Sequence, residues 1–130
     1  MRHSSKASRI LLIDDDPLLI KLAGGILTAE GYDILTSTDA PKGLEMAMKE
    51  DVDLIVLDVM IPVINGFNIC RLIKSQESRK KIPIVLLTSR DEDADRKLGE
   101  EAGANAYIAK PLNREHFLNT IAALLAQSAK

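Results

Sequence analysis

The segment "RILLIDDDPLLI", residues 9–20, places three consecutive aspartates directly after an apolar run. The run 9–13 has the length and unbroken hydrophobicity of a strand that is buried on both faces. Pro17 favours the first turn of a helix, so the aspartates fall between a strand and a helix. Clustered carboxylates repel one another unless water, hydrogen bonds or a cation offset the repulsion. The segment therefore predicts a buried strand followed by either a solvated turn or a cation site.

The same alternation of strand and helix continues to the end of the chain. Short apolar runs predict strands at 9–13, 52–58, 82–89 and 104–111, and an alternating pattern predicts a strand more open on one face at 32–37. Longer stretches of helical period predict helices at 17–31, 39–51, about 65–77, 91–103 and 113–129. In the first of these helices one face is apolar, formed by Leu18, Leu19, Leu22, Ile26 and Leu27. Continuous aliphatic strands that alternate with helices predict a doubly wound α/β domain, a five-stranded parallel sheet with helices on both faces.

Polar side chains follow the predicted strands at their carboxyl ends, where ligands bind in sheets of this type. The first strand leads into Asp14 and Asp15, and the third ends in Asp58. The fourth ends in Thr88, and the last ends in Lys110. These residues predict one crevice that holds carboxylates, a hydroxyl and an ammonium group.

Composition limits the classes of function. At 130 residues the chain has the length of one domain, and 46% hydrophobic residues argue against disorder. A net charge of -2 gives no footprint for nucleic acid or for an anionic membrane. Cys70 is the one cysteine, so we expect a reduced core thiol and a cytoplasmic protein. No apolar stretch approaches the roughly 20 residues of a membrane span.

Three carboxylates at the strand ends suit Mg²⁺, a hard cation that prefers oxygen ligands. With Asp14 and Asp15 holding the metal, Asp58 is placed to attack a phosphoryl group as a nucleophile and become an aspartyl phosphate. The Lys110 ammonium and the Thr88 hydroxyl are donors for phosphoryl oxygens.

Four motifs together resemble the receiver domain of two-component response regulators, the family of the chemotaxis regulators. They are "ILLIDDDP", "DLIVLDVMIPVINGF", "IPIVLLTS" and "GANAYIAKP", in the family's order and spacing. The resemblance covers about residues 9–128 and leaves 1–8 as an N-terminal tail. It implies the flavodoxin-like strand order 2-1-3-4-5, which is the order found in the chemotaxis member of the family.

The resemblance also assigns roles at the predicted crevice. It implies that Asp14 and Asp15 form the acidic pair, that Asp58 is the phosphoacceptor, and that the backbone carbonyl of Met60 completes the protein ligands of Mg²⁺. Asp16 matches no ligand position, and we interpret it as a turn residue or the acid at the start of a helix.

Two further positions match the family's switch residues. Thr88 resembles the switch hydroxyl, and Tyr107 resembles the aromatic residue that moves inward with it. Lys110 resembles the lysine before a proline, and the family typically has a cis bond there. Ser89 stands where a small alanine is usual, which leaves the lifetime of a phosphoryl group open.

We therefore predict a signalling receiver that catalyses only its own phosphorylation and autodephosphorylation. Its expected partners are a histidine kinase or phosphotransfer protein, and a downstream protein target or an output domain outside this sequence. We expect no direct contact with nucleic acid or membrane. The alternatives are a non-phosphorylated receiver-like binding domain and, less favoured, a haloacid dehalogenase-like phosphatase. That phosphatase needs a second acid at the position of Met60.

Overall fold

The computed structural model describes residues 7–89 and 93–128. Strands and helices alternate along the chain. The strands are β1 (Arg9–Ile13), β2 (Asp33–Ser37), β3 (Leu54–Asp58), β4 (Ile84–Thr88) and β5 (Ala106–Ala109). The helices are α1 (Pro17–Ala29), α2 (Ala40–Lys49), α3 (Gly66–Lys74), α4 (Asp93–Glu101) and α5 (Arg114–Ser128). All ten elements overlap the ranges expected from the sequence.

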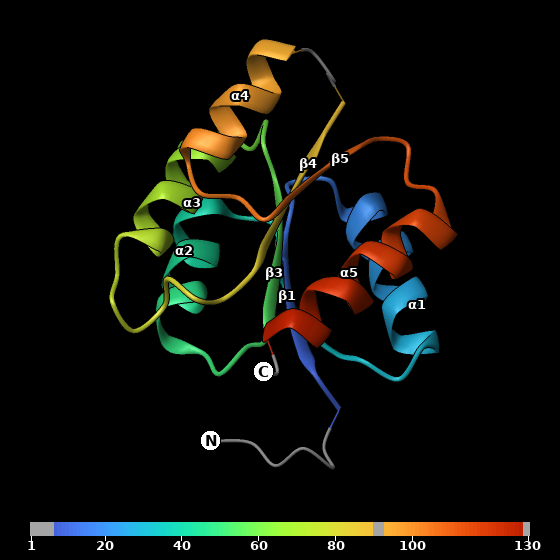
Figure 1. Cartoon of the computed structure of the whole chain (residues 1–130). Helices are drawn as coiled ribbons and strands as arrows, with labels where there is room; N and C mark the ends of the chain where they lie inside the picture. Colours follow the sequence, from blue (N-terminus) through green and yellow to red (C-terminus); the bar gives the residue numbers. More distant parts are fainter. Residues whose placement is uncertain (1–6, 90–92, 129–130) are drawn as a thin grey trace.

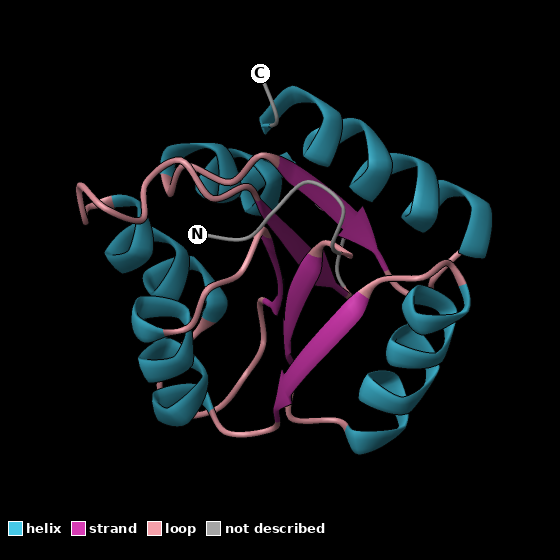
Figure 2. Ribbon diagram, turned by 90° about the horizontal axis from the view of Figure 1, so that it is seen from below, coloured by secondary structure: helices cyan, strands magenta, loops and turns pink. Residues whose placement is uncertain are grey.

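The strands form one parallel sheet in the order β2-β1-β3-β4-β5. Helices α1 and α5 cover one face of this sheet, and α2, α3 and α4 cover the other (Figure 1). The view from below shows the same arrangement, with the sheet between two groups of helices (Figure 2). The predicted doubly wound fold and strand order are confirmed.

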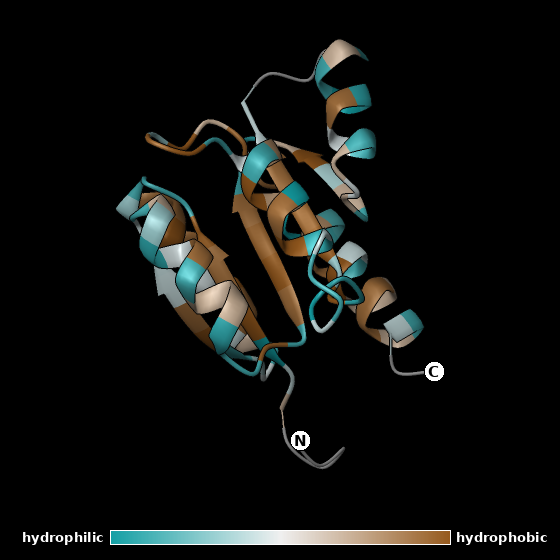
Figure 3. Cartoon of the chain, turned by 90° about the vertical axis from the view of Figure 1, so that its left-hand side faces the viewer, coloured by the Kyte–Doolittle hydropathy of each residue, from teal (hydrophilic) through white to brown (hydrophobic). Residues whose placement is uncertain are grey.

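Each face of the sheet carries its own hydrophobic core, because successive strand residues point to opposite faces. In Figure 3 the strands are the brown, apolar layer between the helices. On the α1 and α5 side the core includes Leu12, Val56 and Phe117, all at most 2% exposed. On the other side it includes Leu11 and Ile55. Burial on both faces explains why β1, β3 and β4 read as unbroken apolar runs.

The helices begin at the polar residues expected from the sequence. Asp39 accepts a hydrogen bond from the backbone N–H of Lys42, and Asn113 accepts one from that of His116. These bonds satisfy N–H groups that have no partner within the helix. Gly31, with φ 92°, follows the end of α1, as its predicted role as a stop requires.

One expected helix face is wrong in part. Leu18 and Leu22 of α1 are 76% and 54% exposed, whereas Leu19, Ile26 and Leu27 of the same expected face pack in the core. The buried face is made by Ala23, Gly24 and Leu27. Gly24 lets α1 lie close to the sheet: a Cβ there would stand 2.8 Å from the Ile34 side chain. The small residues Ala23 and Gly24, which an apolar pattern does not mark, thus lie on the buried face where Leu18 and Leu22 do not.

Cys70 is fully buried in α3, and its thiol donates to the carbonyl oxygen of Ala102 at 3.5 Å. Burial raises the pKa of this thiol to about 11. The expected core thiol is confirmed, since an un-ionised buried thiol packs as a small apolar group.

At the amino ends of β4 and β5, the Lys74 ammonium joins three segments. It donates to the backbone oxygens of Lys80 and Ile82, at 3.1 and 2.7 Å, and to Asn105 Oδ1 at 2.9 Å. The same Oδ1 accepts from the N–H of Ile84 at 2.9 Å. We call these residues the Lys74 joint.

No helix within residues 7–89 and 93–128 combines the length and the apolar character needed to cross a bilayer. Most of the predicted tail 1–8 lies outside the described residues. Residues 91 and 92 of the helix expected at 91–103, and residue 129 of the helix expected at 113–129, also lie outside them. The division of the chain into a tail and a domain stays a prediction.

Candidate functional site

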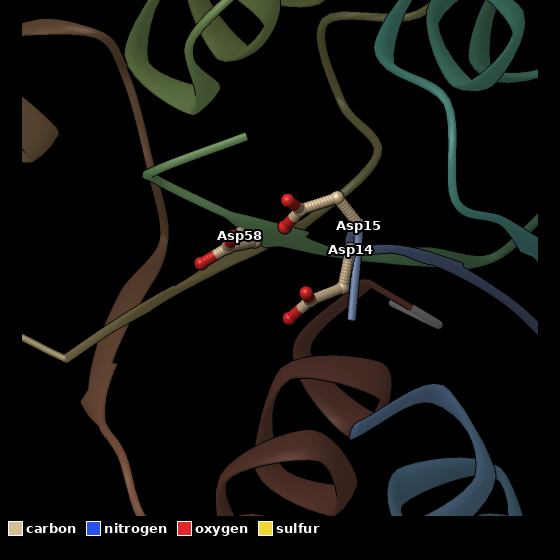
Figure 4. A group of neighbouring side chains, drawn as sticks. All are labelled: Asp14, Asp15 and Asp58. Carbon is tan, nitrogen blue, oxygen red and sulfur yellow. The ribbon is translucent and has the colours of Figure 1, made fainter. Parts of the chain in front are cut away.

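Strand register brings the predicted carboxylates together. Ile13 pairs with Leu57, so Asp14 and Asp58 follow at the same level on adjacent strands. Oxygens of Asp14, Asp15 and Asp58 lie within 4.8 Å of one another, and Figure 4 shows the three side chains at the strand ends. Asp14 and Asp58 are buried, whereas Asp15 is exposed. The carboxylates expected to share a site therefore do so.

Lys110 completes the group from the end of β5. Its ammonium donates to Asp14 Oδ2 at 3.0 Å and to Asp58 Oδ1 at 3.2 Å. The peptide bond between Lys110 and Pro111 is cis, as the resemblance to receivers implies. The lysine at the end of β5 thus contacts the carboxylates that follow β1 and end β3.

Backbone N–H groups hold the two buried carboxylates from the other side. The N–H of Asp16 donates to Asp14 Oδ1 at 2.9 Å, and the N–H of Met60 donates to the Asp58 carboxylate. The side chain of Asp16 itself turns away and accepts from the N–H of Leu18 at 3.0 Å. Asp16 is thus the N-cap of α1, as we interpreted it, and stands apart from the carboxylate cluster.

The electrostatics of the site favour an added cation. Burial raises the pKa of Asp58, the charge of Asp14 raises it further, and the hydrogen bonds from Lys110 and Met60 only partly oppose this. Burial alone would lower the pKa of Lys110, but its bonds to Asp14 and Asp58 outweigh burial, so that pKa is raised. One ammonium therefore serves more carboxylates than it can neutralise.

The two predicted switch residues lie on β4 and β5, at different distances from this cluster. Asp58 pairs with Leu87, so Thr88 stands one residue further along β4, where it is 1% exposed. Tyr107 pairs with Leu86 and is half-buried. Thr88 is thus placed at the edge of the crevice, and Tyr107 lies two residues before the level of Thr88.

Two contacts at the site were missed by sequence reasoning. The guanidinium of Arg96, on α4, lies 5.1 Å from the centre of the Tyr107 ring. The backbone N–H of Met60 donates to the Asp58 carboxylate, although the side chain of Met60 is 56% exposed. Neither contact has a sequence signal, because one depends on the turn between α4 and β5 and the other on the backbone path after β3.

The model of the response regulator receiver domain family matches residues 10–122. The chain therefore belongs to the response regulator receiver family, a class of signalling domain. This membership agrees with the fold and with the acidic cluster described above, and it does not favour the phosphatase alternative.

Curated relatives agree with this family. The chain is 40% identical over 107 residues to the response regulator PleD of Caulobacter vibrioides. The aligned residues are 82% of this chain and 24% of PleD. It is 37% identical over 120 residues to the alkaline phosphatase synthesis transcriptional regulatory protein PhoP of Bacillus subtilis, covering 92% of this chain and 49% of PhoP. The chain thus spans about a quarter to half of the length of these relatives.

Solved structures give the same result. A CheY-like receiver domain protein from Methanospirillum hungatei has a TM-score of 0.88 and 27% identity, with 95% of this chain and 98% of that chain covered. The receiver domain of the sensor histidine kinase PA1611 from Pseudomonas aeruginosa has a TM-score of 0.85 and 28% identity, over 92% and 98%. The latter structure has a magnesium ion coordinated in its active site cleft.

Proposed function

We propose that this chain accepts a phosphoryl group on Asp58 and relays that signal through a change of its surface. The observation that carries the proposal is the shared ammonium: Lys110 bonds to both Asp14 and Asp58 at the carboxyl ends of three strands. A receiver-like domain that served only to bind a protein would have no chemical need for these buried charges, which are costly to desolvate.

In the proposed reaction, an oxygen of Asp58 attacks the phosphorus of a phosphodonor. The Asp58 O–P bond forms as the bond from phosphorus to the donor's imidazole nitrogen, or to the acyl oxygen of a small acyl phosphate, breaks. Lys110 is placed to move its hydrogen bonds to the transferred oxygens, and Thr88 to donate its hydroxyl to one of them. The chain would thereby catalyse its own phosphorylation. Water that attacks the same phosphorus would break the Asp58 O–P bond, release inorganic phosphate and restore the carboxylate.

Mg²⁺ fits the residues present. The three carboxylates offer hard oxygen ligands within 4.8 Å of one another, and their charge exceeds that of Lys110. Asp14, Asp15 and Asp58 would hold the ion, with the carbonyl oxygen of Met60. When bound, Mg²⁺ would offset negative charge on the phosphoryl oxygens. The magnesium in the PA1611 receiver supports this assignment.

The proposed switch joins Asp58 to Tyr107 through Thr88. A hydroxyl that turns toward the phosphoryl group vacates space along β4, and the neighbouring aromatic ring responds. We expect the phosphodonor to be a histidine kinase or a phosphotransfer protein, and the surface around α4, β5 and α5 to contact a downstream protein or an output domain. We expect these exchanges to occur in the cytoplasm.

The test is the intact mass of the protein after incubation with acetyl phosphate, with and without Mg²⁺. We expect a gain of one phosphoryl group that requires Mg²⁺ and is lost in Asp58→Asn. Asp33→Asn is the matched control, because Asp33 is an exposed aspartate at the opposite end of β2. A mass gain that persists in Asp58→Asn would mean that a residue other than Asp58 accepts the phosphoryl group. No gain, together with no binding of Mg²⁺, would favour the non-phosphorylated binding domain.

A further inference from the structure

The first residue of α3 lies directly against the backbone of Asp58. The N–H of Gly66 donates to the carbonyl oxygen of Val59 at 2.9 Å. A Cβ added to Gly66 would stand 2.7 Å from Val59 Cα and 2.9 Å from the Asp58 carbonyl carbon, and closer still to the Asp58 carbonyl oxygen. These are main-chain atoms, which cannot turn aside as the end of a side chain can.

Other helical glycines differ from Gly66 in this respect. A Cβ on Gly25 of α1 would meet nothing within 4 Å. For a Cβ on Gly43 of α2, the three nearest atoms would all belong to the side chain of Ile13. The close approach at Gly66 is therefore specific to the point where α3 abuts the end of β3.

The same contact determines the path of the chain after Asp58. Val59 donates its N–H to Leu87 of β4 at 2.9 Å and accepts from Gly66 through its carbonyl. Between these two bonds, the N–H of Met60 reaches the Asp58 carboxylate. The peptides of Asp58, Val59 and Met60 are thus held between β4 on one side and the start of α3 on the other.

We propose that Gly66 is a positioning residue for phosphoryl transfer. By lacking a side chain, it lets α3 rest on the Asp58 peptide and so sets the place of the Asp58 carboxylate and of the Met60 backbone. This inference rests on the proposed role of Asp58. An added methyl group would displace the Asp58 carboxylate and the Met60 backbone, and a small displacement of a reacting group slows the reaction strongly.

The variant that tests this is Gly66→Ala, measured for its rate of phosphorylation by acetyl phosphate and for Mg²⁺ affinity by calorimetry. We expect the rate to fall at least ten-fold and Mg²⁺ binding to weaken at least three-fold, with the far-UV spectrum unchanged. Gly25→Ala is the matched control and keeps both values. Asn65→Ala removes the cap that accepts from the Asn68 N–H, so it weakens α3 without adding an atom against Asp58. It should lower the urea midpoint and keep both values.

A wild-type rate and Mg²⁺ affinity in Gly66→Ala would overturn the inference, as would equal losses in Asn65→Ala. If Gly66→Ala does not fold, amide exchange of the wild-type protein decides: the Gly66 N–H must be protected as strongly as the Val59 N–H, and rapid exchange at Gly66 would refute the inference. A wild-type chain that neither binds Mg²⁺ nor accepts phosphoryl would instead refute the proposed function.

Discussion

Two lysines at opposite ends of the sheet show how the charge of the partners decides what a half-buried ammonium does. Lys110 stands at the carboxyl ends of the strands and bonds to two carboxylates, of Asp14 and Asp58. Lys74 stands at the amino ends of β4 and β5, and all three of its acceptors are neutral oxygens. Both ammonium groups are well supplied with hydrogen bonds, so the number of bonds does not distinguish them.

The pKa values of the two groups are displaced in opposite directions. Burial lowers the pKa of Lys74, because neutral carbonyl oxygens do not repay the loss of water around the charge. Carboxylate partners outweigh burial at Lys110 and raise its pKa. An ammonium among carboxylates can move its hydrogen bonds when the charge around it changes, for example when a phosphoryl group arrives. An ammonium among carbonyls serves to hold loops in place.

The largest expected effect separates the two lysines by chemistry. Lys110→Met removes the donor placed for a phosphoryl oxygen, and we expect the rate of phosphorylation by acetyl phosphate to fall about 100-fold. Lys74→Met, at the other end of the sheet, should stay within about two-fold of the wild type, since it touches no reacting group. Rates from intact-mass time courses check this, and an equal loss in both variants would break the comparison.

The next effect separates them by stability. Lys74→Met leaves the oxygens of Lys80, Ile82 and Asn105 without the ammonium, and we expect a loss of about 2 kcal/mol in the free energy of unfolding. Lys110→Met also destabilises the chain in the absence of Mg²⁺, because two buried carboxylates lose their counter-charge.

Urea unfolding with and without Mg²⁺ measures the difference. A bound cation stabilises the folded state by mass action, so Mg²⁺ should recover most of the loss in Lys110→Met. It should recover none of the difference between Lys74→Met and the wild type. Recovery of both variants would mean that the Lys74 joint is coupled to the acidic cluster.

A third prediction concerns the partner of Lys110. The raised pKa of Asp58 means that its ionised form is costly in the folded state without Mg²⁺. That cost is present at neutral pH and disappears as the pH falls through the raised folded value toward 3.8. Asp58→Asn should therefore be more stable than the wild type at pH 7, by less than the loss in Lys74→Met. The two urea midpoints should converge near pH 4, and a gap that widens in acid would contradict this sign.

These two lysine sites also differ in how far sequence reasoning could reach. Lys110 was predictable because unbroken apolar runs locate the strands, and the polar residue at the end of each strand then falls in one crevice. The Lys74 joint had no such signal. Two of its acceptors are main-chain oxygens, and main-chain geometry in the loop between α3 and β4 leaves no trace in residue type.

The same limit explains the misplaced leucines of α1. Periodicity places Leu18 and Leu22 on an apolar face, but it does not say how closely the helix approaches the sheet. Gly24 lies on the buried face, against the Ile34 side chain. At Gly66, likewise, the motif marked the residue without showing that its missing side chain makes room for the Asp58 peptide. Chemistry at strand ends was readable from the sequence, and close backbone approach was not.

The smallest expected effect converts one lysine site toward the other. Asn105→Asp keeps the oxygen that accepts from the Ile84 N–H and places a carboxylate beside the Lys74 ammonium. The pKa of Lys74 should rise relative to the wild type, because the new charge favours the ammonium, as the carboxylates do at Lys110. The pair is partly exposed, so the gain in stability should be only about 0.2–1 kcal/mol, and 1 M salt should remove most of it. The contribution of Lys74 to wild-type stability should rise at alkaline pH, as the group loses its costly charge between its lowered pKa and 10.5; the difference from Lys74→Met separates it from the opposing contribution of Cys70, whose raised pKa makes stability fall from about pH 9 to 11. Asn105→Asp should reduce that rise. A salt-independent gain, or an unchanged alkaline rise, would mean that hydrogen-bond geometry and not partner charge distinguishes the two ends of the sheet.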